Sequence, residues 1–228
     1  MEVNKDFLRD QWTSLGIAFA AKSKIKNADP EATLILSLKE FYEDRKILKI
    51  VISWLDEFGD LVHVERLKIL ARKLNARDQA WLGLIADYMV NVRKDYRFKK
   101  ILEMVENHLG KPPAVFEQSK FMELHFEREI LKGSVSIGKK FGLNISQSDL
   151  IGYPKKLQEK RAAIMGNIWL RMRLLFGCSW RADVCTVILL DMAQNYYQVK
   201  KVLGCSIETA HRNWKSLNES DVLDLFKL

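Results

Sequence analysis

Apolar residues recur every three to four positions along most of the chain, which is the spacing that buries one face of an α-helix. Asp29 and Pro30 form a typical helix start, because Asp caps exposed amides and Pro fits the first turn. Gly110 and the pair Pro112-Pro113 stop the last helix of this series. The pattern predicts helices near residues 5–22, 30–41, 47–58, 64–74, 81–89 and 98–109. Short polar connections between them predict a compact bundle of antiparallel neighbours.

The helical pattern weakens after residue 110. Residues 111–156 contain three of the four prolines and several glycines, and residues 121–131 fit either a helix or a strand. We therefore expect a connector with short elements. The predicted organisation is an N-terminal helical domain, a connector and a C-terminal domain, over residues 1–110, 111–154 and 155–228.

Helical periodicity returns in the C-terminal part. It predicts helices over residues 156–176, 180–192, 196–203 and 206–217. Gly177 closes the first of these helices, and Ser179 is placed to cap the second. With only four prolines and eleven glycines, the chain has too few turn residues for an all-β protein. The sequence thus predicts an all-α fold, with an N-terminal bundle followed by a separate C-terminal helical module.

The composition is that of a globular protein, with 48% hydrophobic and 29% charged residues in 228. The N-terminus does not resemble a signal peptide, and no apolar run approaches the roughly 20 residues that span a bilayer. The three cysteines lack metal-type spacing and are odd in number, which favours buried thiols in a reducing environment. We therefore expect a cytoplasmic protein without a membrane anchor.

Positive charge is concentrated in the C-terminal part. The net charge is +8, and residues 155–217 hold 11 Lys and Arg against 4 Asp and Glu. Residues 218–228 are acidic. A basic excess of this kind is expected where a protein approaches phosphates, although a solvated basic face gives the same count.

The residues around Gly204 carry a resemblance to a known family. Gly204 lies at a turn, Ser206 can cap the next helix, and the matching positions that follow are Thr209, Ala210, Arg212, Trp214 and Leu217. Upstream, a Phe-Gly turn at residues 176–177 precedes the run Arg181-Ala182-Asp183-Val184. Over its last quarter the chain resembles the helix-turn-helix core of winged-helix transcriptional regulators.

This resemblance implies binding of double-stranded DNA. Arg212 is the candidate for reading a guanine edge, and the lysines are candidates for phosphate contacts. One recognition helix covers only a short half-site, so the resemblance also implies a homodimer. The implied nucleic-acid-binding residues are Lys200, Lys201, Ser206, Ile207, Glu208, His211, Arg212 and Lys215.

Three features depart from the family pattern. Lys200 stands where these motifs usually have a small alanine, and Trp214 replaces a leucine. Residues 219–228 are too few for the β-hairpin wing. These departures leave a second function open, that of a helical protein-interaction module such as an antitoxin or adaptor. In either case the N-terminal helices would serve dimerisation, effector sensing or binding of a protein partner.

No pattern in the sequence indicates catalysis. The histidines are scattered, and none has a Cys, Asp or Glu neighbour at a spacing typical of a metal site. They are His63, His108, His125 and His211. We therefore expect a protein that is not an enzyme, with no catalytic residues, metal or cofactor.

Overall fold

The computed structural model describes residues 5–19, 24–110, 136–220, 223 and 226, and these residues are mainly helical with no sheet. The all-α fold class is therefore confirmed. None of the described helices is long and apolar enough to cross a membrane. The first part contains α1 (Lys5–Ser14), α2 (Pro30–Leu38), α3 (Arg45–Phe58), α4 (Val64–Ala71), α5 (Ala76–Asn91), α6 (Lys99–Leu109) and α8 (Ser136–Lys139). The C-terminal part contains α9 (Lys160–Gly166), α10 (Ile168–Phe176), α11 (Trp180–Leu189), α12 (Tyr196–Leu203) and α13 (Ile207–Glu219). Short 3₁₀ helices connect them: η1 (Gly59–Leu61), η2 (Tyr96–Phe98), η3 (Gln147–Leu150) and η4 (Pro154–Lys156).

The first helix is shorter than the sequence pattern predicts. Instead of continuing toward residue 22, the chain turns at Gly16, whose φ of 96° is readily adopted only by glycine. A Cβ at Gly16 would lie 2.5 Å from the Cβ of Ala163, so α9 also requires glycine here. Ile17 then forms an antiparallel bridge with Leu157. The prediction of one helix over residues 5–22 is wrong because these contacts come from distant parts of the chain.

A break at Asn167 divides the helix predicted over residues 156–176 into α9 and α10. Asn167 has an extended backbone, with φ −131° and ψ 119°, and its Oδ1 accepts hydrogen bonds from the N–H groups of Trp169 and Leu170. Its Nδ2 donates to the carbonyl oxygen of Ala28 at 2.9 Å. The side chain thus caps α10 and attaches it to the loop before α2.

Buried apolar side chains form two clusters. The larger cluster, the first core, contains apolar residues of α1–α6 together with Phe141, Leu143, Ile145, Leu150, Ala163, Ile164 and Leu170. The described part of the expected connector therefore packs on the first core. The second core joins α10–α13. Its buried residues include Trp169, Cys185, Val199, Leu203, Ala210 and Leu217. The expected domain limits stay a prediction.

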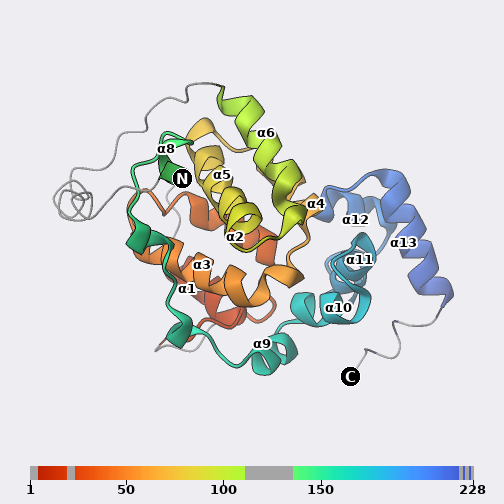
Figure 1. Cartoon of the computed structure of the whole chain (residues 1–228). Helices are drawn as coiled ribbons and strands as arrows, with labels where there is room; N and C mark the ends of the chain where they lie inside the picture. Colours follow the sequence, from red (N-terminus) through yellow and green to blue (C-terminus); the bar gives the residue numbers. More distant parts are fainter. Residues whose placement is uncertain (1–4, 20–23, 111–135, 221–222, 224–225, 227–228) are drawn as a thin grey trace.

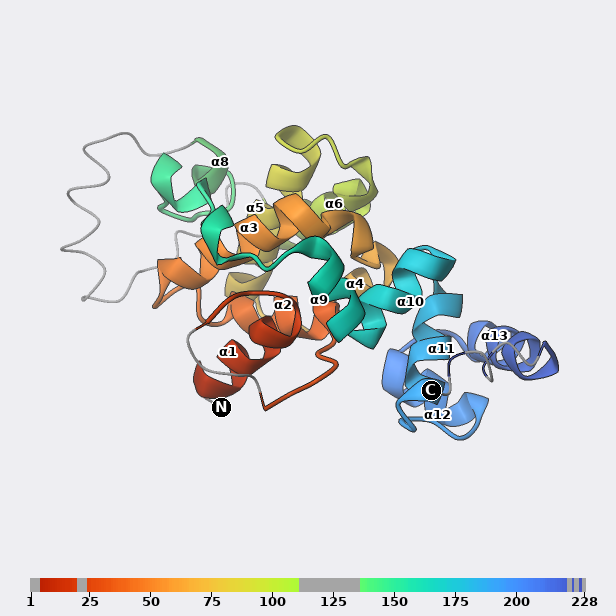
Figure 2. The ribbon, with the colours of Figure 1, turned by 90° about the horizontal axis from the view of Figure 1, so that it is seen from below.

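The second core lies beside the N-terminal helices as a separate group. Figure 1 shows α10–α13 at one side of the molecule, with α4 between this group and the rest of the bundle. In the view from below, α13 again lies at the outer edge, far from α8 (Figure 2). Both views thus leave one side of α13 facing away from the bundle.

Candidate nucleic-acid interface

The candidate interface is built on α12, α13 and the turn between them. Gly204 ends α12 in the left-handed conformation, with φ 74°. Ser206 begins α13, and its Oγ accepts a hydrogen bond from the N–H of Thr209 at 3.1 Å. Both local roles that the sequence indicates for Gly204 and Ser206 are confirmed. Between them, Cys205 is buried and holds the turn on the second core.

Apolar contacts fix the orientation of both helices. Val199 and Leu203 of α12 and Ala210 and Leu217 of α13 are fully buried in the second core. In an α-helix, residues three and four apart share a face. The opposite faces of α12 and α13 therefore point outward.

The structure brings the implied nucleic-acid-binding residues to these outward faces. Ile207 alone among them is half-buried, since it lies beside the turn. Lys200 is exposed, so its stem leans out to solvent and α12 packs closely despite the missing alanine. Trp214, which replaces the leucine expected there, is half-buried against the second core. The exposed members are Lys200, Lys201, Ser206, Glu208, His211, Arg212 and Lys215.

Most of the positive charge on this surface is unpaired. Within the described residues, no carboxylate lies at ion-pair distance from Lys200, Lys201 or Arg212. Lys215 pairs with Glu219 at 3.6 Å, but both side chains are more than 60% exposed and such a pair is weak in water. Three cations are thus free to meet a negatively charged partner. Together with His211 and Lys215, they form the surface that is called the basic face below (Lys200, Lys201, His211, Arg212 and Lys215).

Glu208 is an acidic residue beside the basic face. Hydrogen bonds from its own backbone N–H and from Ser206 lower the pKa of its carboxyl, and the charge of Lys200 lowers it further. Glu208 is therefore ionised near neutral pH. A carboxylate at this position disfavours phosphate but can accept a hydrogen bond from a base amino group, such as that of cytosine.

Sequence reasoning missed two tyrosines beside the basic face. The rings of Tyr196 and Tyr197 lie 4.3 Å apart between centroids, and Tyr196 meets the ring of His211 edge-on at 4.8 Å. The sequence contains a signal for their position, because each tyrosine stands four residues before a lysine of α12 and therefore shares a helix face with it.

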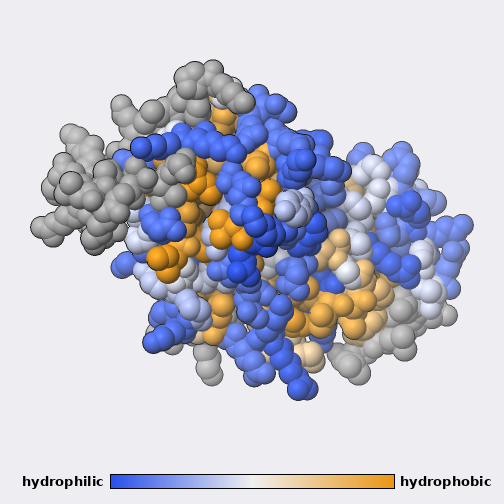
Figure 3. Space-filling view, viewed as in Figure 1, coloured by the Kyte–Doolittle hydropathy of each residue, from blue (hydrophilic) through white to orange (hydrophobic). Residues whose placement is uncertain are grey.

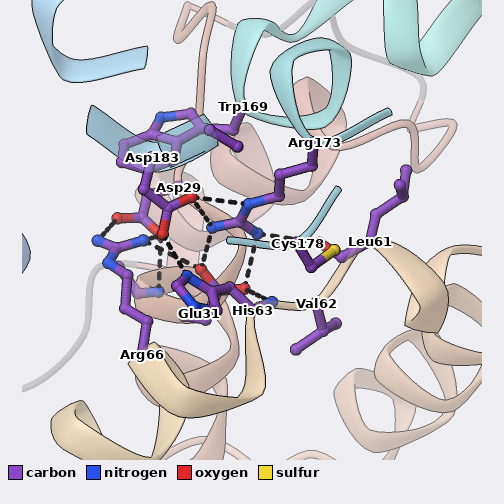
Figure 4. Close-up of polar contacts among 12 residues, drawn as sticks. Asp29, Glu31, Leu61, Val62, His63, Arg66, Trp169, Arg173, Cys178 and Asp183 are labelled. Atoms are coloured by element: carbon purple, nitrogen blue, oxygen red, sulfur yellow. Dashed lines mark hydrogen bonds and ion pairs between the residues drawn. The ribbon is translucent and has the colours of Figure 1, made fainter. Parts of the chain in front are cut away.

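A buried ionic network attaches the C-terminal helices to the bundle (Figure 4). Arg173 of α10 forms two hydrogen bonds with Glu31 of α2, at 2.7 and 2.5 Å, and its Nε donates to Asp183 of α11 at 2.9 Å. Its Nη1 also donates to the carbonyl oxygen of Leu61 at 3.0 Å. All three charged side chains are fully buried. Arg173 therefore holds together three helices from distant parts of the chain.

His63 and Arg66 complete the network from the α4 side. The Nδ1 of His63 lies 2.6 Å from Oδ2 of Asp183, and Arg66 pairs with both Asp29 and Glu31. Burial alone raises the pKa of the Asp183 carboxyl, but the charge of Arg173 and the hydrogen bond from His63 outweigh it and lower the pKa to about 2. Asp183 is therefore ionised at all ordinary pH values. This network could not be predicted from the sequence, since His63 and Asp183 are 120 residues apart.

After α13 the chain returns to the second core. Leu223 is buried there, and the ring of Phe226 packs edge-on against Phe176 at 6.0 Å. No residue that the structure describes beyond α13 lies in a strand. The Phe226 contact places this ring beside the end of α10.

The remaining chemistry of the described part is limited. It contains no group of three His, Cys, Asp or Glu side chains that could hold a metal ion, and His125 lies outside the described residues. Cys185 and Cys205 are buried free thiols, and Cys178 is half-buried. In comparisons with known proteins, no family model, curated protein or solved structure matches the chain.

Proposed function

We propose that the chain is a transcriptional regulator that binds duplex DNA through α12 and α13, with α13 as the recognition helix of a helix-turn-helix. The observation that carries this proposal is the basic face, in which unpaired cations stand on two helices joined by a tight turn. α13 has 13 residues and lies at the outer edge of the molecule, so its exposed side can enter a major groove (Figures 1 and 2).

The proposal gives each of the three unpaired cations a role. Arg212 stands in the middle of α13, where a guanidinium can form two hydrogen bonds with the O6 and N7 atoms of guanine. Lys200 and Lys201 of α12 contact phosphates and set the register of α13 in the groove. Because one such helix reads a short half-site, two copies bind a palindromic site as a homodimer.

Fluorescence anisotropy with a duplex from upstream of the protein's own gene tests this function. We expect Arg212→Ala to weaken binding by ~1–3 kcal/mol and to reduce discrimination against a scrambled duplex. Lys201→Ala is expected to weaken binding to both duplexes and to lower the slope of log K against log salt by about 0.9. Lys99→Ala, which removes an exposed lysine from α6, is the matched control and is expected to bind as the original protein does. Unchanged affinity of the Arg212→Ala and Lys215→Ala variants at low salt would overturn the proposal.

A protein-interaction module is the second candidate, and a hydrophobic surface favours it. Leu174 and Leu175 of α10 are 59% and 55% exposed, and Figure 3 shows hydrophobic surface over α10 and α11 next to hydrophilic surface over α13. Large exposed apolar patches often mark protein contacts. A folded protein that does not bind DNA, but loses a protein partner when Leu174 and Leu175 are changed to Ser, would favour this function.

A further inference from the structure

Three rings form a continuous row across α12 and α13. Tyr197 is 64% exposed and packs against Tyr196, which in turn contacts His211. The Tyr196–His211 contact is edge-on, with an angle of 78° between the ring planes, a geometry that aromatic pairs prefer. The aromatic row (Tyr197, Tyr196 and His211) therefore links the exposed sides of the two helices.

The aromatic row is continuous with the basic face. Tyr196 and Lys200 are four residues apart on α12, as are Tyr197 and Lys201, so each ring stands one turn before a lysine on the same side. On α13, His211 likewise stands one turn before Lys215. On each helix, a ring of the row thus lies one turn from a lysine of the basic face.

The charge of its surroundings indicates what covers this row. Lys200, Lys201 and Arg212 are exposed and unpaired within the described residues, so the partner supplies negative charge. A phenol group is a neutral donor that reaches a phosphate oxygen, and tyrosine is among the side chains that contact the DNA backbone. The sugar–phosphate backbone of duplex DNA fits both the cations and the hydroxyl groups.

The two tyrosines differ in what they can offer. Tyr197 is 64% exposed, whereas Tyr196 is half-buried between its two ring neighbours. Tyr196 has a ring contact on each side, whereas Tyr197 has one ring neighbour and an exposed outer face.

We propose that Tyr197 donates a hydrogen bond to a DNA phosphate, and that Tyr196 is a positioning residue that keeps His211 oriented toward the bases. This inference rests on the proposed function. It adds to that function a neutral backbone contact on α12 and a mechanical link from α12 to a side chain of the recognition helix.

The first test compares Tyr197→Phe with Lys201→Ala in salt titrations of DNA binding. Removing a neutral donor to a charged acceptor is expected to weaken binding about tenfold. The salt slope is expected to stay the same, because a phenol releases no counterion, whereas the lysine change lowers the slope by about 0.9. Tyr153→Phe is the matched control, since Tyr153 is also exposed beside a lysine, Lys49, but lies before η4 on the bundle.

The second test examines the link between Tyr196 and His211 with a double-mutant cycle. We expect Tyr196→Ala and His211→Ala each to weaken binding. The double variant is expected to have the same affinity as whichever single variant binds DNA less tightly. Tyr196→Phe keeps the ring and is expected to retain at least half of the coupling. Circular dichroism melts check that each variant is folded.

The outcomes separate this inference from the proposed function. If Arg212→Ala weakens binding but Tyr197→Phe does not, the DNA-binding function stands and the phosphate contact of Tyr197 is overturned. Additive effects of Tyr196→Ala and His211→Ala would overturn the positioning role. If neither Arg212→Ala nor Lys215→Ala changes affinity, both the function and this inference are wrong.

Discussion

Arg173 and Glu31 form an ion pair with two hydrogen bonds, although they lie 142 residues apart and neither side chain is exposed to solvent. The pair joins α2, which belongs to the first core, to α10, which places Leu170 in the first core and Ile168, Trp169 and Met172 in the second. Opposite charge raises the pKa of the Arg173 guanidinium despite the cost of its burial. The orientation of α10–α13 relative to the bundle therefore depends on buried charges as well as on apolar contacts.

Removing Arg173 is expected to be strongly destabilising. Arg173→Met removes the guanidinium that pairs with the buried side chains of Glu31 and Asp183, so we expect the free energy of unfolding to fall by ~3–5 kcal/mol. Urea denaturation measures this change. Lys215→Met, which removes a cation from the exposed pair with Glu219, is the control and is expected to cost at most ~1 kcal/mol. Similar losses in the two variants would show that the buried network does not stabilise the fold.

Acid is expected to destabilise the protein through Asp183. The pKa of its carboxyl is about 2 in the folded state, against about 3.9 for an unfolded aspartate. The ionised group therefore stabilises the fold above about pH 4, and on the order of 2 kcal/mol is lost as the pH falls toward 2. Urea midpoints at pH 7, 4 and 2.5 follow this loss, and Asp183→Asn is expected to remove this part of the pH dependence. The exposed carboxylate of Asp60 provides the control, since Asp60→Asn is expected to leave the acid-induced loss unchanged.

Asn167 is expected to be more important for stability than its place between two short helices suggests. Asn167→Ala removes the cap of α10 and leaves the carbonyl oxygen of Ala28 without this donor, so we expect a loss of ~1–3 kcal/mol. Asn218→Ala is the matched control, because its hydrogen bond to the carbonyl oxygen of Trp214 is exposed. A thermal melt in which the two variants behave alike would contradict the role of Asn167.

The turn between α12 and α13 is expected to require glycine. At Gly204 the φ of 74° is costly for any other residue, and a Cβ would lie 3.2 Å from Cγ2 of Ile69 on α4. We expect Gly204→Ala to lower the free energy of unfolding by ~1–2 kcal/mol. Gly166→Ala at the end of α9 meets no atom within 4 Å and is expected to be neutral or slightly stabilising. Equal stability of the two variants in urea would contradict this prediction.

Much of the C-terminal part could be predicted from local signals. The caps at Ser179 and Ser206, the turn at Gly204 and the buried positions of α12 and α13 lie within a few residues of the groups they contact. Local hydrogen bonds and a 3.6-residue period are sufficient to determine such features. The exposed set of candidate residues followed from the same period, with Ile207 as the half-buried exception.

Other features could not be predicted because their partners are distant in sequence. Asn167 interrupts an otherwise continuous helical pattern, and its amide bonds to residues of the loop before α2. An arginine such as Arg173 in a basic helix also looks like a surface residue until Glu31 and Asp183 are placed around it.

The sequence by itself determined the helical class, most of the helix starts and the amphipathic faces of α12 and α13, because each depends on residues within one or two turns. Only the tertiary structure decided where helices break, which charges are buried and how α13 is held at the edge of the molecule. These features arise from contacts such as Arg173 with Glu31 and Tyr196 with His211, in which folding brings together groups that no local pattern relates.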